Sequence, residues 1–497
     1  MDSHAKLQLL EGDQVIGILS EEAFADQYNQ LFGNCPYKTI FQSLEFVNSW
    51  YTAQIKEFHP VAILEFEQDK LKAALWLAIG KNKQGKHKKR KAKLIGAGEY
   101  DAEYQTWLVE SGYEGIFLPL AFKALFEKFP KSKIIFRFVP HIESLEWIQS
   151  DNYWQKFTVI QPYHRPLLQM NHPDYKEVYK KRHLKAKYNR FSKAGHMELV
   201  EVKELDHFIH IYDKIMLLLD FRQGALFNKI PSQDNPNRKN LFVTLFKQNL
   251  LHVSVLTLDH DITSCIIGMK DGTWMHLAGL ITYSPFYGKL SPGLVHIYVL
   301  GKLLEEEGYQ YFDLTPGDDG YKERMASNAD EVYELTVTQD TRFKLKRSLR
   351  KYFHELLLSR GIRPMSFNLA LQRKKYHLSF KLRNLKNQLF KPRKTVVTKT
   401  TDVNESLELP VLEKNKIEHL LMYQESNGNS RWSFLEDAFT RIQEGEKFFS
   451  SIHDGKLIYC QWFSESETSP LITSTYVHPE WKNEELNFDS KVPKKDF

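Results

Sequence analysis

The stretch from Phe312 to Ala326, FDLTPGDDGYKERMA, gathers groups that can transfer protons and stabilise charge. A carboxylate can relay a proton, a phenol can donate one, and an ammonium group can stabilise a developing oxyanion. The candidates are Asp313, Asp318, Asp319, Tyr321 and Lys322. Two aspartates beside Gly320 are also an ordinary turn composition, and a tyrosine there is often a packing residue. Lys322 is the residue that turn chemistry explains least, and it therefore ranks first.

A second candidate stretch, YSPFYGKLSPGLVHIYVL (283–300), leads into a predicted helix over 293–307 that ends at Gly308. Ser-Pro at positions 291 and 292 is common helix-start punctuation. The free N–H groups and positive dipole end of such a helix also suit a phosphate or pyrophosphate. The candidate ligands are Tyr283, Lys289, Ser291 and Gly293. Taken alone, the stretch favours an ordinary helix start, so the surrounding elements must decide.

Two further side chains carry suitable chemistry. Arg222, in LLLDFRQG after an expected helix, would either bind an acidic substrate group through two hydrogen bonds or pair with Asp220. His276 lies inside an expected strand and is a candidate base. A lone histidine on a strand is more often a hydrogen-bonded core residue, which is the interpretation preferred here.

The elements that must position these residues form a repeat. After Asn249 the runs LLHVSVLTL, ITSCIIGMK and TWMHLAGLI predict three strands, followed by the helix above and the strand YQYFDL. The first third of the chain has the same β-β-β-α-β order, with a helix expected around 117–129. The offset of about 190 residues indicates a duplicated domain. A basic helix ended by Gly195 is expected to join the two copies.

A shorter echo lies at the C-terminus. The helical pattern SFLEDAFTRIQEG precedes the strand-like runs KFFSSIH, KLIYCQWFS and LITSTYV, and the chain then ends in polar sequence. The pattern predicts a partial third copy, tethered by a linker over 392–410 that is too poor in aromatic residues to pack. Its missing helix would leave an apolar sheet face, for which the second lobe, a partner or another copy would have to provide cover.

Positive charge is concentrated in one segment. The chain carries a net charge of +6, yet residues 342–394 hold 17 Lys/Arg against one acid, Glu355. Leu345, Leu349, Phe353 and Leu356 recur there at helical spacing among basic residues, the pattern of an interfacial or docking helix. Packing of this stripe against the second lobe is the alternative. A second basic cluster, residues 81–93, is interpreted as a solvated loop.

Composition sets further bounds. Three widely spaced cysteines, Cys35, Cys265 and Cys460, provide neither a disulfide framework nor metal-ligand spacing. The N-terminal sequence lacks the apolar region of a signal peptide, and no run approaches the length of a membrane span. We therefore expect a cytoplasmic protein without a metal.

The strand order, together with TIFQSLEFVNSW (39–50), SPGLVHIYVL (291–300) and FDLTPGDDGYKERMA, resembles the FemAB-like, CelD-type group of GNAT acetyltransferases with a BioF2-like domain. The resemblance covers residues 35–345 and implies an α/β (α+β) protein. It would hold tandem GNAT-like acyl-CoA N-acyltransferase folds with mixed, mostly antiparallel sheets and a partial third copy. The expected units are a first lobe (1–170), a basic joining helix (171–197), a cofactor-binding second lobe (198–345), a basic helical segment and linker (346–410), and a partial domain (411–497).

The resemblance also implies where the donor would bind. In such folds the pantetheine of acyl-CoA lies between the fourth and fifth strands, with its pyrophosphate on the loop entering the next helix, here 283–293. The usual Arg/Gln-x-x-Gly-x-Gly/Ala pattern is absent from this loop. The matching place in the first lobe carries acids expected to repel a pyrophosphate: Glu99, Asp101, Glu103, Glu110 and Glu114.

Roles follow for the site residues under this resemblance. Lys322 would stabilise the oxyanion or anchor an acidic acceptor, and Tyr321 would donate a proton to the leaving thiolate. Asp313 would relay a proton from the amine, while Arg222 and Asp318 would contact the acceptor.

The expected function is N-acyl transfer, with acetyl-CoA or another acyl-CoA as co-substrate. The acceptor would be an amino-sugar or amino-acid-like amine, a small molecule or a glycan precursor of cell-envelope or polysaccharide biosynthesis. One alternative is an aminoacyl-tRNA-dependent transferase of the peptidoglycan-bridge kind, in which the joining helix and residues 342–394 bind tRNA. Another is a non-catalytic scaffold. The basic segment would otherwise hold the protein at an anionic membrane surface, peripheral to the inner face of the membrane.

Overall fold

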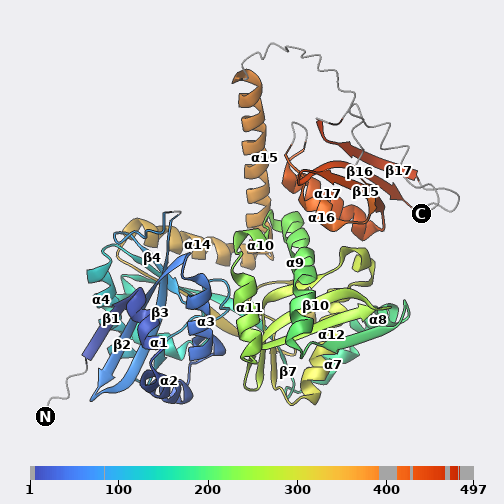
Figure 1. Cartoon of the computed structure of the whole chain (residues 1–497). Helices are drawn as coiled ribbons and strands as arrows, with labels where there is room; N and C mark the ends of the chain where they lie inside the picture. Colours follow the sequence, from blue (N-terminus) through green and yellow to red (C-terminus); the bar gives the residue numbers. More distant parts are fainter. Residues whose placement is uncertain are drawn as a thin grey trace.

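A computed structural model describes most of the chain: residues 6–82, 84–390, 411–425, 429–464, 471–479 and 481. Within these ranges one 13-stranded sheet runs through both lobes, and a separate four-stranded sheet lies near the C-terminus (Figure 1). The large sheet has the order β1-β2-β3-β4-β6-β13-β7-β12-β11-β10-β9-β8, with β5 (Leu108–Val109) paired to β3 off this path.

The first lobe is a sheet with helices on both faces. Alternating residues of β2 point to opposite faces: Ala62 and Leu64 pack into one apolar cluster, and Val61 and Ile63 into another. Both clusters are buried, which explains the nearly continuous apolar runs in these strands. The elements are β1 (Lys6–Glu11), α1 (Asp13–Leu19), α2 (Glu22–Asn34), α3 (Leu44–Gln54), β2 (Phe58–Glu67), β3 (Lys70–Gly80), β4 (Lys93–Gly96), α4 (Glu114–Lys128) and β6 (Lys133–Val139).

The second lobe repeats this order. Strands β8 to β11 are antiparallel neighbours, and β12 then joins β11 in parallel, just as β6 joins β4 in the first lobe. The predicted duplication and the predicted fold class are therefore confirmed. The elements are β8 (Met197–Glu201), α9 (Leu205–Phe227), α11 (Arg238–Lys247), β9 (Leu251–Leu258), β10 (Asp261–Asp271), β11 (Trp274–Tyr283), α12 (Pro292–Glu306), β12 (Tyr311–Asp313) and α13 (Gly320–Met325).

The two lobes exchange their last strands. β7 (Thr158–Gln169) follows the first lobe in sequence but pairs with β12 of the second, and β13 (Asn328–Thr338) follows the second lobe but pairs with β6 of the first. β7 and β13 also pair with each other, from Leu167 with Asn328 to Thr158 with Val337. This exchange joins the lobes into one continuous sheet, so their relative position is fixed by backbone hydrogen bonds.

Two sequence predictions about helices need correction, and a third is confirmed. The basic joining helix is two helices, α7 (Tyr175–Lys180) and α8 (Arg182–Ser192), because the backbone of Lys181 is extended between them, with ψ at 116°. Arg222 lies inside the long helix α9, whereas the sequence analysis placed it after a helix. The helix predicted over 293–307 is confirmed as α12, and Gly308 follows it with φ at 86°. A positive φ at this position favours glycine.

Beyond β13 the chain leaves the large sheet. α14 (Thr341–Ser359) packs against β7 and β13, and α15 (Pro364–Phe390) then extends away toward the C-terminal unit (Figure 1). That unit has the strand order β14-β15-β16-β17, which matches the first four strands of each lobe. Its elements are β14 (Glu413–Lys414), α16 (Ile417–Leu421), α17 (Arg431–Glu444), β15 (Lys447–His453), β16 (Lys456–Ser464) and β17 (Leu471–Val477).

The apolar side of the C-terminal unit is covered by the second lobe. Leu218, Phe221 and Ala225 of α9 share one buried cluster with α16, α17, β15 and β16. The linker predicted over 392–410 lies outside the described residues. The domain limits given from the sequence stay predictions. In the part of the chain that is described, no helix is long and apolar enough to cross a membrane.

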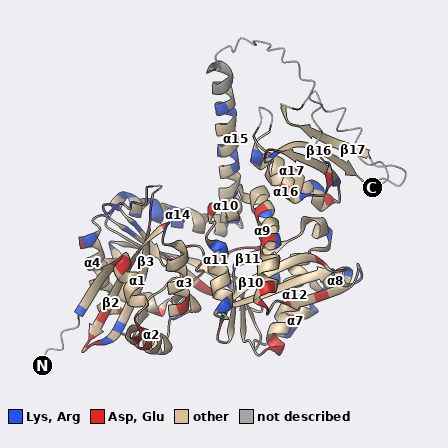
Figure 2. Ribbon diagram, viewed as in Figure 1, with Lys and Arg blue, Asp and Glu red and all other residues tan. Residues whose placement is uncertain are grey.

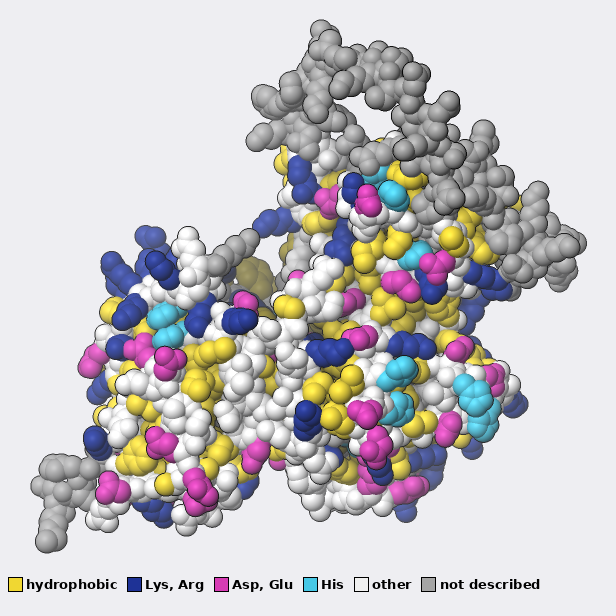
Figure 3. Space-filling model, viewed as in Figure 1, with side chains coloured by type: hydrophobic (Ala, Val, Ile, Leu, Met, Phe, Trp, Pro, Cys, Tyr) yellow, Lys and Arg dark blue, Asp and Glu magenta, His cyan; other side chains and the backbone are white. Residues whose placement is uncertain are grey.

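The short basic cluster at 81–93 connects β3 to β4. Its described lysine and arginine side chains are largely exposed, which agrees with the interpretation as a solvated loop. Lys and Arg side chains crowd this edge of the first lobe (Figure 3).

Candidate active site

Two parallel strands of the second lobe form a fork. β11 and β12 pair at three positions, Trp274 with Tyr311, Met275 with Phe312, and His276 with Asp313. They then part, so the later residues of β11 have no partner in β12. Unpaired backbone N–H and C=O groups at such an edge are available to an extended ligand.

A buried polar network holds the base of the fork. Asp313 is fully buried, and its Oδ2 accepts a hydrogen bond from the Tyr104 hydroxyl and lies 2.8 Å from His276 Nδ1. Its Oδ1 accepts from the backbone N–H of Thr315 at 2.7 Å. His276 Nε2 lies 3.3 Å from Asp271 Oδ2, which in turn accepts from the backbone N–H of Ile40 at 2.9 Å. The network therefore ties both lobes to the fork.

The charges in this network stabilise one another. Burial alone would lower the pKa of His276, but its hydrogen bonds to Asp271 and Asp313 raise that pKa above its ordinary value. Burial would likewise raise the pKa of Asp313, but His276 and the Arg165 guanidinium lower it. Arg165 lies between the rings of Tyr104 and Trp274, at 5.1 and 5.3 Å, and pairs with Asp330. Asp313 thus acts as an ionised anchor, with both oxygens engaged.

Lys322 fastens the turn that follows β12. Its Nζ donates to the Thr315 carbonyl at 3.0 Å, the Thr315 hydroxyl at 2.8 Å and the Pro316 carbonyl at 3.3 Å, and it lies 3.5 Å from Asp319 Oδ2. Thr315 and Gly317 have φ at 65° and 131°, a conformation that costs Thr315 free energy and that these contacts help to maintain. Burial lowers the pKa of Lys322. With its donors occupied, Lys322 holds the turn in place, and its predicted catalytic role stays a prediction.

Arg222, Tyr283 and Tyr321 come together beside the fork. The Arg222 guanidinium lies 5.4 Å from the centre of the Tyr283 ring, and its Nη1 donates to the Ile281 carbonyl of β11 at 3.5 Å. Burial and Asp319 raise the pKa of Tyr321 to about 12, against the opposing charges of Arg222 and Arg363. Arg222 therefore contacts Tyr283, and its charge also acts on the Tyr321 phenol.

Arg222 forms no ion pair with an acid of its own helix. The predicted alternative, a pair with Asp220, is wrong, because Asp220 accepts hydrogen bonds from the backbone N–H of Ser232 at 3.0 Å and from the Ser232 hydroxyl. Among the described residues, no carboxylate forms an ion pair with Arg222, and its buried Nε has no hydrogen-bond partner. A guanidinium in this state is available to an anionic ligand.

The loop entering α12 is held by basic side chains of α8. Lys187 Nζ donates to Ser291 Oγ at 2.7 Å, and Arg190 donates to the Lys289 carbonyl. The loop forms the short helix η3 (Pro285–Leu290), and Ser291 follows it with φ at 56°. Positive charge therefore surrounds the N-terminus of α12. A Cβ atom at Gly293 would lie 3.5 Å from the Tyr283 side chain, which is an ordinary contact. Packing within the protein therefore does not require glycine at this position, whereas close approach of a ligand would.

The C-terminal unit also reaches this loop. Gln443 of α17 donates to the Tyr283 hydroxyl at 3.0 Å, and the ring of Phe439 lies 6.3 Å from that of Tyr283. A Cβ atom at Gly288 would lie 3.0 Å from the Gln443 side chain, so the two segments are in close contact. From the sequence, cover of the C-terminal unit was open between the second lobe, a partner and another copy. In the structure, α17 is part of the surroundings of the loop entering α12.

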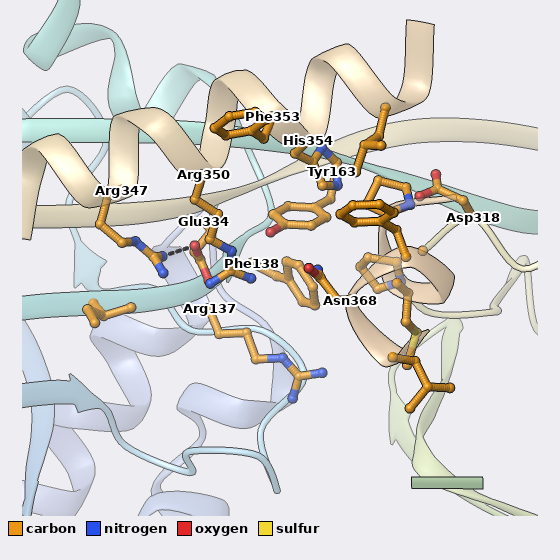
Figure 4. A pocket seen from close by; sticks show the side chains of 18 of the residues that line it. Arg137, Phe138, Tyr163, Asp318, Glu334, Arg347, Arg350, Phe353, His354 and Asn368 are labelled. Atoms are coloured by element: carbon orange, nitrogen blue, oxygen red, sulfur yellow. Dashed lines mark hydrogen bonds and ion pairs between the residues drawn. The ribbon is translucent and has the colours of Figure 1, made fainter. Parts of the chain in front are cut away.

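A cavity of about 1400 Å³ lies between the first lobe, the turn at 316–319 and the helices α14 and α15 (Figure 4). Asp318 and Asp319 belong to its wall, and Arg363 pairs with Asp319 while Arg347 pairs with Glu334. Basic residues outnumber the acids of the wall, which are Glu99, Asp318, Asp319 and Glu334. The basic residues are Lys91, Lys93, Lys133, Arg137, Lys229, Arg347, Arg350, Arg360 and Arg363. Such a wall attracts anions.

The acids of the first lobe are less repulsive than expected. Glu103 pairs with Arg137 at 3.2 Å, Asp101 with Arg238 at 3.1 Å, and Glu110 with Lys72 at 2.5 Å. The argument that these carboxylates exclude a pyrophosphate is therefore weaker than the sequence indicated, because tertiary partners compensate much of their charge.

The interpretation of His276 as a hydrogen-bonded core residue agrees with the structure, whereas Tyr104 and Arg165 were missed. His276 and Asp313 stand at matching positions of the two strands that lead into the fork, a signal available once both strands were predicted. Tyr104 and Arg165 come from the first lobe and from the exchanged strand β7, whose partners no local pattern reveals.

One family model matches part of the second lobe. Residues 179–323 match a family model described as an acetyltransferase (GNAT) domain. No curated protein matches the sequence. One similar solved structure is that of FemX, with 10% identity and a TM-score of 0.45, covering 65% of this chain and 98% of that chain.

Two other solved structures cover a similar share of this chain. The C-terminal domain (DUF2156) of a putative lysylphosphatidylglycerol synthetase from Agrobacterium fabrum has 12% identity and a TM-score of 0.40, covering 66% of this chain and 95% of that one. A tandem GNAT protein from the clavulanic acid biosynthesis pathway has 9% identity and a TM-score of 0.39, covering 67% of this chain and 98% of that one.

The segment that matches the family model contains the fork, the α12 loop and the whole turn at 315–319. The first lobe repeats the strand order of this segment, including the parallel pair that parts. Residues 179–323 therefore match an acetyltransferase (GNAT) domain, and the first lobe has the same strand order, which agrees with the tandem GNAT-like fold predicted from the sequence.

Proposed function

We propose that this protein is an N-acyltransferase that moves an acyl group from acyl-CoA, bound at the fork of β11 and β12, to an amine on an anionic acceptor in the basic cavity. The observation that carries the proposal is the turn at 315–319. It begins at the fork, where Thr315 donates to Asp313, and its later residues Gly317 to Asp319 line the cavity. A donor and an acceptor in these two places would meet across the turn.

The donor side is supported by the charge around the α12 loop. Lys187 and Arg190 reach the loop, and the N-terminal N–H groups of α12, a 15-residue helix, point toward it. A pyrophosphate is stabilised by both features. Arg222 and the free edge of β11 lie farther along the fork, where an extended pantetheine would run.

The acceptor side is supported by the cavity. Its basic wall suits an amino-sugar or amino-acid-like molecule that also carries a phosphate or carboxylate, such as a glycan precursor. Asp318 lines the same wall and would take the proton that the ammonium group must lose before the amine can attack.

The reaction requires few groups. The neutral amine attacks the thioester carbonyl and the C–N bond forms, while the nitrogen loses a proton to water. The C–S bond then breaks with release of a thiolate. Tyr321, with its pKa raised to about 12, keeps its proton at neutral pH and can donate it to this thiolate. Lys322 and the Asp313 network act by holding the turn and the fork in position.

An aminoacyl-tRNA donor is the second candidate, because Arg347 and Arg350 of α14 line the cavity. Lysine and arginine also recur along α14 and α15 (Figure 2). Calorimetric titration with acetyl-CoA, paired with filter binding of charged tRNA at several salt concentrations, separates the two. Acetyl-CoA binding and thiol release on addition of an amine would support the acyl-CoA reaction. Salt-sensitive tRNA binding without CoA binding would replace it with the second candidate, and binding of neither donor would favour a non-catalytic scaffold.

A further inference from the structure

Helix α14 presents an apolar stripe to solvent. Leu345, Leu349 and Tyr352 follow one another at spacings of four and three residues and are 49 to 61% exposed. The opposite side of the helix provides the packing contacts: Arg347 bonds to Thr336 and Glu334, and His354 packs on Tyr163. Of the stripe predicted from the sequence, Leu345, Leu349 and Phe353 are exposed and therefore do not pack against the second lobe, whereas Leu356 is half-buried.

Helix α15 continues the pattern. Leu371, Leu378, Leu382 and Leu385 are 51 to 61% exposed and recur at spacings of seven, four and three residues, which places them on one face. The other face contacts the C-terminal unit, where Arg373 pairs with Glu436 at 2.7 Å and Phe380 is buried. The leucine stripe thus points away from the unit that covers the rest of the helix.

Basic side chains border both stripes. On α14 the exposed Arg342 and Lys346 lie to one side of the apolar residues, and on α15 Lys374, Lys375 and Lys381 are exposed close to the leucines. The single acid of residues 342–394, Glu355, lies within 3.8 Å of Lys351. Exposed leucine and aromatic residues bordered by lysine and arginine are typical of helices that lie in a membrane interface. Figure 2 shows the basic residues distributed along both helices.

We propose that α14 and α15 dock this protein on an anionic membrane surface, with the two apolar stripes entering the headgroup region and the lysine and arginine residues contacting anionic lipids. Charge complementarity favours an anionic membrane as the partner of this basic face. A second copy of the same face would bring two strongly positive segments together, which is unfavourable. RNA would satisfy the basic residues but would leave the leucines in water, whereas an anionic bilayer accommodates both.

Docking would also orient the cavity. Phe353, Met365 and Phe367 are exposed beside the stripes and line the cavity where α14 approaches α15 (Figure 4). The cavity mouth would then face the lipid, and an acceptor carried in the membrane plane could reach it. This orientation does not depend on the identity of the acyl donor.

Vesicle flotation with the full chain tests the proposal. The probes are vesicles of phosphatidylcholine alone and vesicles that also contain phosphatidylglycerol. We expect the protein to float with the anionic vesicles only, and binding to weaken as salt rises. The variant L345S/L349S/Y352S should lose about tenfold or more in vesicle affinity, since three apolar side chains no longer enter the interface.

The matched control is I116S/L120S, which removes two exposed apolar residues from α4 on the first lobe. It should bind vesicles as the unchanged protein does, and circular dichroism should show the same helix content for all three proteins. Equal recovery with both vesicle types, or equal binding by the stripe variant, would overturn the proposal. So would light scattering that shows a dimer which the stripe variant dissociates, because the stripes would then be an interface between copies.

Discussion

Replacing Asp313 by Asn should destabilise the protein by about 3 kcal/mol. The substitution keeps the shape of the side chain but leaves His276 and Arg165 without the buried negative charge that lies between them. Removing one partner of a buried ion pair typically costs about 3–5 kcal/mol. Arg165 retains its pair with Asp330, so the lower end of that range applies. Urea unfolding of both proteins at neutral pH measures the difference in the free energy of unfolding.

A double-mutant cycle isolates the interaction between Asp313 and His276. D313N, H276Q and the double variant should show a coupling free energy of about 1–3 kcal/mol, as expected for residues that share one network. The free energies should be compared at several pH values. The pKa of His276 is raised from 6.5, so its contribution is fully present below pH 6.5 and is lost as the pH rises through the folded-state pKa.

The contribution of Asp313 to stability depends on pH in the opposite direction. Its pKa is lowered from 3.8, so its contribution is present above pH 3.8 and is lost as the pH falls through the folded-state pKa. The cost of D313N should therefore be greatest between these limits. A loss below about 1 kcal/mol, or no coupling between the two sites, would refute the account of the fork as a charged, mutually stabilised network.

Three further predictions concern the turn, the cavity and the proposed acid. K322A should lower the midpoint of thermal unfolding, since it removes hydrogen bonds that hold the turn, and a stable K322A protein with impaired turnover would instead support the direct catalytic role. Y321F should lower turnover about a hundredfold with unchanged donor affinity if the phenol protonates the thiolate, as single-turnover kinetics would reveal. R350S should raise the KM for an anionic acceptor about tenfold, because Arg350 lines the cavity, whereas R342S, on the same helix but outside the cavity wall, should leave it unchanged.

The local elements were predictable because their patterns are local. Apolar runs bounded by turn residues predicted β9, β10 and β11, and Ser291, Pro292 and Gly308 predicted both ends of α12. The β-β-β-α-β order followed from these elements alone. Pairing partners are not encoded in this way, since the exchange of β7 and β13 depends on contacts between residues more than 150 positions apart, as for Leu167 and Asn328.

The candidate site was predictable in part for the same reason. The sequence identified Arg222 and Tyr283 in separate motifs, but only the folded chain shows that the guanidinium of Arg222 lies over the Tyr283 ring. Lys322 appeared unexplained because its partners, the carbonyls of Thr315 and Pro316, are backbone atoms whose positions depend on an unusual turn conformation. His276 was interpreted as a core residue, and it is buried, yet its partner Asp313 lies on another strand.

The central claim is that the second lobe binds the acyl-CoA donor at the α12 loop. Calorimetric titration of CoA into the full chain tests it most directly, with K187E as the loop variant and K91E as a matched charge reversal in the cavity wall of the first lobe. We predict one CoA site, weakened about tenfold or more by K187E and unchanged by K91E. Absence of CoA binding, or weakening by K91E alone, would contradict the claim, and the second of these results would move the donor to the first lobe.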